Sequence, residues 1–356
     1  MNISAAQVHH ETRAMNAEAA TEAGLRYVSD AIPGFSRIRR GKSFSYLDQT
    51  GRRITETRTL ERIRSLVIPP AWVDVWICPS AKGHIQAVGR DARRRKQYRY
   101  HHEWAVTRDS AKFHRMIEFG KALGRIRSRT DRDLKKPALC RERVLATIVR
   151  IMEKTAIRVG NEEYARTNGS YGLTTLKDQH AIAKGAHVTF KFRAKSGVLQ
   201  RIELDDARLA VMVKRCQDLP GQTLFQYLDE ESEPRQIDSS DVNDYIREIS
   251  GADFTAKDFR TWTATVLAAA QLSAAAAQHD CPTSERGRRR VLNAAIDVVA
   301  AHLGNTKAVC RRSYIHPAVM KSFMDGHTLR LPKTGTPTIA ACEAALLQFL
   351  LSPPVS

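Results

Sequence analysis

Acidic residues and long apolar runs are both scarce in this sequence. Its 356 residues include 57 Lys and Arg but only 38 Asp and Glu, which gives a formal net charge of +19. Such a balance favours a polyanionic partner. No apolar run approaches the length of a membrane-spanning helix, so nucleic acid suits the charge better than a membrane does. Residues 1–20 also lack the apolar segment of a signal peptide, and we expect a cytoplasmic, nucleoid-associated protein.

The sequence also lacks the spacings that bind metals or nucleotides. Six cysteines are scattered without a C-x-x-C pair, which predicts reduced cysteines that pack in the interior. Residues 41–43 (Gly-Lys-Ser) resemble the end of a phosphate-binding loop, but Ser36 stands where that loop needs a glycine. A zinc-binding helix beginning at His102 would need a second histidine where the chain has Val106. We therefore expect no metal, no nucleotide and no other cofactor.

The first hundred residues predict a small antiparallel sheet with one helix. Residues 41–54 alternate around a glycine-containing turn and indicate a hairpin, and residues 73–77 and 84–89 alternate as further strands. Thr59 is a candidate N-cap for a short helix over residues 60–66.

A basic cluster follows these strands and surrounds two tyrosines. Alternation along a strand would place Tyr98 and Tyr100 on one face together with Lys96. Basic side chains neutralise phosphates, while aromatic and amide groups contact sugars and base edges. The cluster therefore indicates a surface that binds nucleic acid. Its basic members are Arg90, Arg93, Arg94, Arg95, Lys96 and Arg99.

The remainder of the chain is mainly helical. A core helix is predicted over residues 139–157, where apolar residues recur at steps of three and four. Residues 187–192 and 198–204 alternate around a turn and place Lys195 at the tip of a hairpin. Asp205 or Asp206 is expected to cap the next helix. Further helices are predicted over residues 264–277, which are rich in alanine, and over 291–303, which follow a basic run at 286–290.

These patterns predict an α+β fold of two domains. A loose N-terminal arm is expected over residues 1–20 and a small antiparallel β-rich domain over residues 21–106. A joint is expected near residues 101–109, and a larger, mainly α-helical domain with a small β-hairpin sheet over residues 107–356.

The stretch from Gly304 to Pro317 combines a break in a helix with a tyrosine. Asn305 and Tyr314 are nine residues apart, so on one straight helix they would face opposite sides. Gly304 is a natural helix end, and Asn305 or Thr306 a natural N-cap for a second helix. The chain can therefore bend between the two residues and bring their side chains to one site.

Five segments in this order resemble the type IB DNA topoisomerases, and specifically the short poxvirus-like enzymes found in bacteria. The resemblance covers roughly residues 25–335, and one departure is Arg94, where bacterial relatives usually carry glycine. The segments are residues 68–101, 154–176 (including Lys-Thr-Ala-Ile-Arg-Val-Gly-Asn-Glu-Glu-Tyr), 191–197 (Lys-Phe-Arg-Ala-Lys-Ser-Gly), 257–262 (Lys-Asp-Phe-Arg-Thr-Trp) and 304–317.

The resemblance implies a catalytic domain of the tyrosine recombinase and type IB topoisomerase kind, and a role for each matching residue. Tyr314 would be the nucleophile, Arg158 and Arg260 would clamp the phosphate, and Lys195 would act as general acid. Asn305 stands where poxvirus enzymes carry histidine, and it can donate a hydrogen bond to a phosphate oxygen without titrating.

It also implies double-stranded DNA as the partner and a monomer that clamps the duplex. The enzyme would relax positive and negative supercoils through a 3′-phosphotyrosine intermediate, without ATP or a required metal. The DNA-contacting residues would be Arg95, Lys96, Gln97, Tyr98, Tyr100, Tyr164 and Thr175.

Two alternatives remain open on the sequence alone. A tyrosine recombinase shares the Arg-Lys-Arg-Tyr set, but typically places histidine three residues before the second arginine, where this chain has Lys257. A non-catalytic DNA-binding protein on the same scaffold is expected to have lost one of the five catalytic residues, and none is lost.

Overall fold

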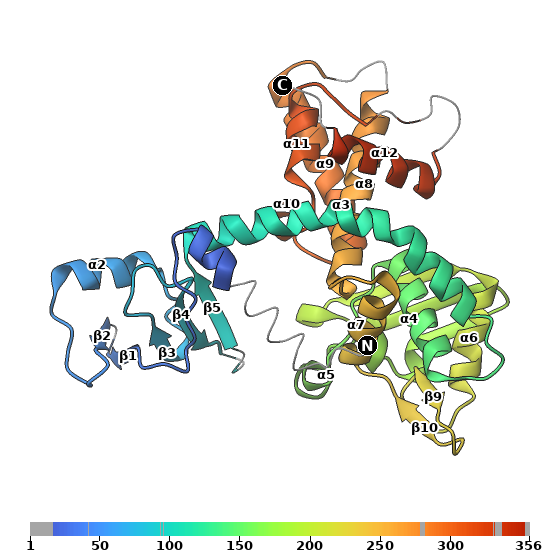
Figure 1. The fold of residues 1–356 in the computed structure, drawn as a ribbon, viewed down its shortest axis with the longest axis horizontal. Helices are drawn as coiled ribbons and strands as arrows, with labels where there is room; N and C mark the ends of the chain where they lie inside the picture. Colours follow the sequence, from blue (N-terminus) through green and yellow to red (C-terminus); the bar gives the residue numbers. More distant parts are fainter. Residues whose placement is uncertain are drawn as a thin grey trace. The chain divides into compact units, whose positions relative to one another are not determined.

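The computed structural model describes residues 17–41, 43–92, 94, 96–277, 282–329, 331 and 337–352, apart from the side chains of residues 105–111 and 114. The chain forms two compact units, Met1–Lys112 and Phe113–Ser356. The first is rich in antiparallel strands and the second is mainly helical with small sheets (Figure 1), so the predicted α+β class is confirmed.

The first unit is built on one five-stranded antiparallel sheet in the order β2-β1-β3-β4-β5. Its helix α2 (Thr57–Ser65) contributes Ile63, which packs with Val75, Ile77 and Ala87 of the sheet in a small core. The strands are β1 (Phe35–Arg40), β2 (Ser43–Leu47), β3 (Val73–Ile77), β4 (Ile85–Arg90) and β5 (Lys96–Tyr100).

The predicted hairpin over residues 41–54 needs correction. Strand β2 pairs along its whole length with β1, which the sequence did not predict, and only the single bridge Leu47–Arg53 joins it to the returning chain. The Asp48 carboxylate accepts hydrogen bonds from the backbone N–H groups of Thr50 (2.8 Å) and Arg52 (2.9 Å), so this turn closes a loop and not a strand pair.

The predicted capping role of Thr59 is also wrong. Helix α2 begins two residues before Thr59, its N-cap is Glu56, and the Thr59 hydroxyl donates to the Glu56 carboxylate at 2.6 Å. Threonine therefore lies inside the first turn, where it binds the cap residue's side chain.

Helix α3 (His102–Asp133) occupies the segment predicted to join the domains. It is 32 residues long, begins in the first unit and ends in the second. The sequence placed a domain boundary between residues 106 and 107, whereas the compact units divide after Lys112. The two boundaries differ by six residues, and the expected limits of the domains stay a prediction.

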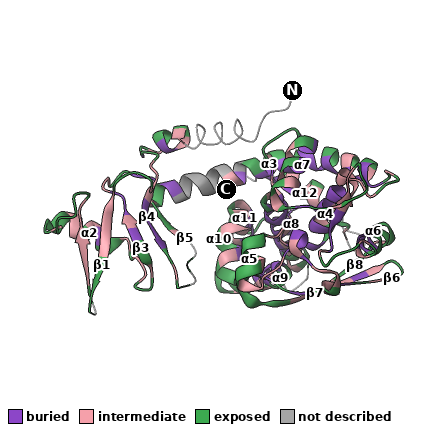
Figure 2. Ribbon diagram, turned by 90° about the horizontal axis from the view of Figure 1, so that it is seen from below, coloured by how far each residue is buried: buried purple, intermediate pink, exposed green. Residues whose placement is uncertain are grey.

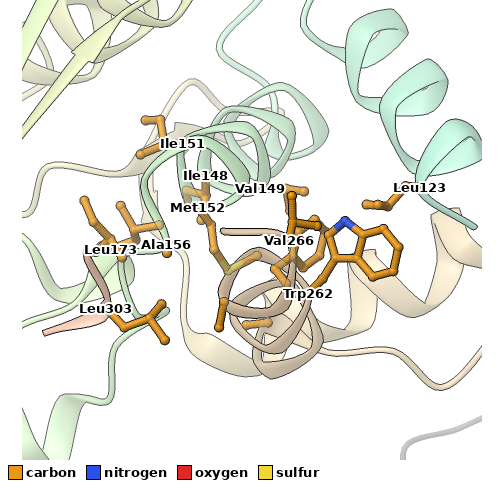
Figure 3. Close-up of a cluster of buried hydrophobic side chains, with 14 of the residues drawn as sticks. Leu123, Ile148, Val149, Ile151, Met152, Ala156, Leu173, Trp262, Val266 and Leu303 are labelled. Atoms are coloured by element: carbon orange, nitrogen blue, oxygen red, sulfur yellow. The ribbon is translucent and has the colours of Figure 1, made fainter. Parts of the chain in front are cut away.

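The second unit is organised around two buried helices. Helix α4 (Arg141–Thr155) matches the predicted core helix and is purple along most of its length in Figure 2. Its residues Ile148 and Met152 are fully buried and lie near Trp262 and Val266 of helix α8 (Ala256–Ala276), as Figure 3 shows. Helix α8 begins eight residues before the predicted Ala-rich helix, because Thr255 and Asp258 form a capping box there.

The predicted hairpin of the second unit is confirmed and gains a strand. Strands β7 (His187–Arg193) and β8 (Leu199–Asp205) pair in continuous register, and the unpredicted β6 (Ala181–Lys184) extends the sheet. Asp206, and not Asp205, caps the next helix, because its carboxylate accepts from the N–H groups of Arg208 and Leu209.

The other elements complete the second unit. A two-stranded sheet joins β9 (Gln226–Leu228) to β10 (Pro234–Gln236). The helices are α5 (Glu162–Asn168), α6 (Ala207–Gln217), α7 (Ser239–Ser250), α9 (Glu285–Leu303), α10 (Lys307–Ser313), α11 (Pro317–Met324) and α12 (Ile339–Leu351).

Two further observations concern the cysteines and the helices. Cys78, Cys140, Cys216, Cys310 and Cys342 are free thiols, while Cys281 lies outside the described residues. None of the helices in the described ranges is both long and apolar enough to cross a membrane.

Candidate active site

The predicted break between Asn305 and Tyr314 is present. Helix α9 ends at Leu303, and its C-cap Gly304 adopts the left-handed conformation (φ 58°, ψ 47°). Thr306 caps α10, because its hydroxyl accepts from the N–H of Val309 at 3.3 Å. Helix α10 then ends at Ser313, and Tyr314 leaves it with φ −132°. Since Thr306 is the cap, the Asn305 side chain is not used for capping.

Asn305 meets Arg158 across the site. The Nη2 of Arg158 donates to Oδ1 of Asn305 at 2.5 Å and, at 3.5 Å, to the carbonyl of Gly304. The Asn305 amide oxygen is thereby fixed on the guanidinium. Its Nδ2 is buried and makes no hydrogen bond to any residue in the described part of the chain. This donor is oriented by Arg158, and the Asn305 side chain helps to lower the pKa of the nearby Tyr314 phenol.

Arg260 is the most deeply buried charge of the site. It lies in the second turn of α8 with 5% of its surface exposed. Its Nη1 donates to the carbonyl of Ala156 and its Nη2 to that of Leu303 at 2.8 Å, so the C-terminal ends of α4 and α9 hold the guanidinium. The guanidinium carbon is 5.6 Å from the centre of the Tyr314 ring. Its Nε is buried and has no hydrogen-bond partner among the described residues.

The electrostatics of the site favour an added negative charge. Burial and the nearby positive charge of Arg158 lower the pKa of Arg260 to about 10, and burial lowers the pKa of Arg158. Burial would raise the pKa of Tyr314, but the opposing effects of Arg260, Arg158 and Asn305 are larger together, and the net pKa is lowered. No carboxylate in the described residues forms an ion pair with either arginine. An anion bound here would be stabilised by both guanidinium groups.

Lys195 lies at the tip of the β7–β8 hairpin, as the sequence predicted. Ser196 (φ 67°) and Gly197 (φ 77°) form the turn, and the Lys195 side chain is exposed. Within the described residues, no hydrogen bond or ion pair joins it to Tyr314, Arg158 or Arg260. The hairpin is nevertheless adjacent to the site, because a Cβ on Gly304 would overlap Nε2 of Gln200 on β8. The structure thus brings four of the five predicted catalytic residues into contact, and Lys195 stays separate.

The tyrosines of β5 share one face, as the alternation predicted. The Tyr98 and Tyr100 rings stack with their centres 5.8 Å apart, and Nζ of Lys96 lies 5.6 Å from the centre of the Tyr98 ring. Lys96 also forms an ion pair with Asp30 at 2.6 Å, and Gln97 donates to Asp91 at 3.0 Å.

Arg94 and Arg95 both belong to the segment that resembles bacterial relatives. Arg95 lies outside the described residues, so the structure says nothing of its contacts. Arg94 adopts a positive φ of 60°, a conformation in which glycine is unstrained. The backbone of this chain therefore keeps the glycine-like turn although the residue is arginine.

The two remaining predicted DNA contacts both belong to the second unit. Tyr164 on α5 is 45% exposed. The Thr175 hydroxyl accepts from the N–H of Gly172 at 3.0 Å and lines a surface hollow of about 630 Å³. The charged lining of this hollow is mixed and comprises Arg166, Lys177, Glu162 and Glu163. Both positions are accessible to a ligand on this surface.

Sequence reasoning missed two residues that hold the site in shape. The backbone at Gly172 approaches the carbonyl of Arg158 so closely that a Cβ there would lie 2.6 Å from that oxygen. Thr265, which falls within the predicted Ala-rich helix, hydrogen-bonds to the backbone of Tyr314 and His316. Gly172 lies inside the motif segment 154–176, which was a weak signal for the first residue. The sequence held no signal for the second.

Comparison with known proteins identifies the family. Residues 94–330 match the family described as eukaryotic DNA topoisomerase I, catalytic core, and residues 43–91 match bacterial DNA topoisomerase IB, N-terminal domain. DNA topoisomerase 1B of Acanthamoeba polyphaga mimivirus is 32% identical over 288 residues, which are 80% of this chain and 85% of the relative. In the described residues no group of three or more His, Cys, Asp or Glu is arranged to hold a metal. With both units matched in order, the chain belongs to the type IB DNA topoisomerases.

Proposed function

We propose that this topoisomerase cuts one strand of double-stranded DNA with Tyr314 and reseals it without ATP or a required metal. The observation that carries this assignment is the position of the Tyr314 phenol beside Arg260 and Arg158, two cations that have no carboxylate partner among the described residues. A phosphodiester supplies the anion that such a site lacks.

The chemical step is an in-line transesterification. The phenol oxygen of Tyr314 gives its proton to solvent water and bonds to the scissile phosphorus, and the bond from phosphorus to the 5′-oxygen breaks. Arg158, Arg260 and the Asn305 amide stabilise the charge on the non-bridging oxygens. The departing 5′-oxygen takes a proton from Lys195. A 3′-phosphotyrosine link retains the bond energy, and reversal of the same steps reseals the strand.

Lys195 would complete this arrangement from the exposed hairpin tip. Its flexible side chain can approach the 5′-oxygen when the DNA is bound, since catalytic contacts are often made only in the substrate complex. Arg158 can assist this proton transfer.

DNA contacts outside the site would come from both units. In the first unit these are Arg95, Lys96, Gln97, Tyr98 and Tyr100, and in the second unit Tyr164 and Thr175. Basic residues would contact phosphates and the tyrosine faces would contact sugars and bases. We propose a monomer that clamps the duplex and lets it rotate about the intact strand, which relaxes supercoils of either sign.

The experiment compares wild type with Tyr314→Phe on supercoiled plasmid in EDTA without ATP. Wild type should give relaxed topoisomers, and SDS should trap DNA on a peptide that contains Tyr314. The variant lacks only the attacking oxygen, so it should bind DNA and form no adduct. Unchanged plasmid with a gel shift in the wild type would identify a non-catalytic binder, and an adduct at another tyrosine would contradict the assignment.

A further inference from the structure

The backbone just after the proposed nucleophile is held by a side chain from another helix. Tyr314 and Ile315 both donate their N–H groups to the carbonyl of Cys310, at 3.0 and 3.1 Å. Helix α10 has ended at this point, so it supplies no partner for the Tyr314 carbonyl. That carbonyl accepts instead from the hydroxyl of Thr265 on α8, at 3.1 Å.

The same hydroxyl also binds the chain two residues further on. The N–H of His316 donates to the Thr265 oxygen at 3.1 Å. His316 is the N-cap of α11, where its Nδ1 accepts from the N–H of Ala318 at 3.1 Å. Thr265 thus connects both sides of the bend between α10 and α11, and the tyrosine lies at the start of that bend.

Thr265 is suited to this task by burial and by its place on α8. It is 0% exposed, and it stands five residues after Arg260 on the same helix, about 7.5 Å along the axis. Its hydroxyl proton is shared between the carbonyls of Tyr314 and Thr261, the latter at 3.0 Å. A branched side chain in a helix has few rotamers, so the hydroxyl position is well defined.

We infer that Thr265 is a positioning residue for the nucleophile, an inference that rests on the proposed role of Tyr314. Its hydroxyl fixes the Tyr314 backbone to the helix that carries Arg260. The phenol and the phosphate-clamping guanidinium therefore keep one spacing through cleavage and resealing. The Thr265 hydroxyl hydrogen-bonds to backbone groups of Tyr314 and His316, so it acts on the phenol through the backbone.

The test uses Thr265→Val, which keeps the shape and removes the hydroxyl, and Thr265→Ser, which keeps the hydroxyl. Single-turnover cleavage, resealing and DNA affinity are measured on one fixed duplex, well below the lowest melting temperature of the set. A misplacement of about 1 Å costs on the order of 10²-fold in rate. We expect Thr265→Val to slow both cleavage and resealing by about that factor, because both pass through one transition state, and Thr265→Ser to restore most of the rate.

DNA affinity and the cleaved fraction at equilibrium should not change in Thr265→Val, since neither depends on the height of the barrier. Thr147 provides the matched control, because it is also 0% exposed in a helix and, among the described residues, its hydroxyl donates only to the carbonyl of Arg143, at 2.8 Å. Thr147→Val should cleave at the wild-type rate. If Thr265→Val fails to fold, Thr265→Ala against Thr265→Ser isolates the same hydroxyl.

The outcomes separate this inference from the assignment on which it rests. Suppose that the wild-type protein forms its adduct at Tyr314 and that Thr265→Val, or Thr265→Ala, cleaves at the wild-type rate. This result overturns the role of Thr265 and leaves the role of Tyr314 intact. An equal slowing by Thr147→Val also overturns it, because any buried hydroxyl would then have the same effect. A wild-type adduct at another tyrosine removes the nucleophile assignment and this inference together.

Discussion

Asn305 illustrates how one side chain can be oriented entirely by its neighbour. Because Arg158 can only donate hydrogen bonds, the Asn305 atom that faces it at 2.5 Å must be the amide oxygen. The NH₂ group is then directed away from Arg158 as a buried donor. This orientation predicts that the amide contributes a hydrogen bond to the phosphate, and not charge or proton transfer.

Asn305→Ala should therefore lose one preoriented donor. Losses of this kind lower rates by roughly 10²–10³-fold, or about 2.7–4 kcal/mol. Asn305→His should keep much of the activity because imidazole also offers a donor. Asn305→Asp can still accept from Arg158 but cannot donate when ionised, and its charge opposes the phosphate, so it should be no better than alanine. Single-turnover cleavage on a fixed duplex ranks the four proteins. Wild-type cleavage by Asn305→Ala would remove Asn305 from the proposed catalytic set.

Predictability from sequence differs among the residues of the site. Arg158, Arg260, Asn305 and Tyr314 could be named because they fall in segments that carry recognisable neighbours in a fixed order. Thr265 could not, since its hydroxyl is 49 positions from its partner carbonyl and nothing local distinguishes it from a packing residue. The contacts of Arg260 with the carbonyls of Ala156 and Leu303 were equally invisible, because backbone acceptors leave no mark on the sequence.

At the scale of elements, Arg158 is held by a short backbone contact and not by a helix. The segment after α4 pairs with the turn at Gly172: Leu173 donates to the carbonyl of Arg158 at 2.9 Å, and Thr174 to that of Val159 at 2.7 Å. A Cβ on Gly172 would lie 2.6 Å from the Arg158 oxygen and 2.6 Å from the Gly160 nitrogen. Only glycine allows the two segments to approach this closely.

Gly172→Ala should separate these segments and move Arg158. Overpacking of this kind costs about 1–3 kcal/mol of folding free energy, and a displacement of about 1 Å at the site costs on the order of 10²-fold in cleavage rate. Gly124→Ala is the control, because a Cβ on that exposed glycine of α3 meets no atom within 4 Å. It should be stabilising by about 0.5–1 kcal/mol and cleave normally. Urea unfolding and single-turnover cleavage test both variants, and wild-type behaviour of Gly172→Ala would show that the segments can adjust.

The elements found from sequence are those with a strong period of their own. Strands β7 and β8 alternate clearly, and α4 has an apolar face, so each could be recognised alone. Strand β1 has apolar residues only at positions 35 and 38, which do not alternate, and β6 has four residues, two of them alanine. Both strands exist because a neighbouring strand offers hydrogen-bond partners, and that information is not local.

At the scale of the whole molecule, the excess positive charge is divided almost equally between the units. Residues 1–112 contain 20 Lys and Arg against 11 Asp and Glu, a net charge of +9, and residues 113–356 contain 37 against 27, a net charge of +10. A single binding site on one unit would not require this division. It agrees with the proposal that both units contact the DNA backbone.

Lys96 allows the contribution of the first unit to be measured. Its ammonium is shared between the Tyr98 ring and the Asp30 carboxylate, whose hydrogen bond raises the pKa of Lys96. A DNA phosphate would compete with Asp30 for this cation. Lys96→Ala should therefore weaken binding and reduce the slope of log K against log salt by about one.

Asp30→Asn makes the test directional, because it removes the competing carboxylate and leaves Lys96 in place. Its affinity for DNA should rise, and the rise should be greatest at low salt, where phosphate contacts are strongest. Lys214→Ala is the matched control, since Lys214 is also paired with an aspartate, Asp218 at 3.0 Å, but lies on α6 outside the proposed contacts. Titrations of one duplex at several salt concentrations compare the three variants with wild type. Should Lys96→Ala behave like Lys214→Ala, and Asp30→Asn bind no more tightly than wild type, then the Lys96 face of β5 does not contact the DNA backbone.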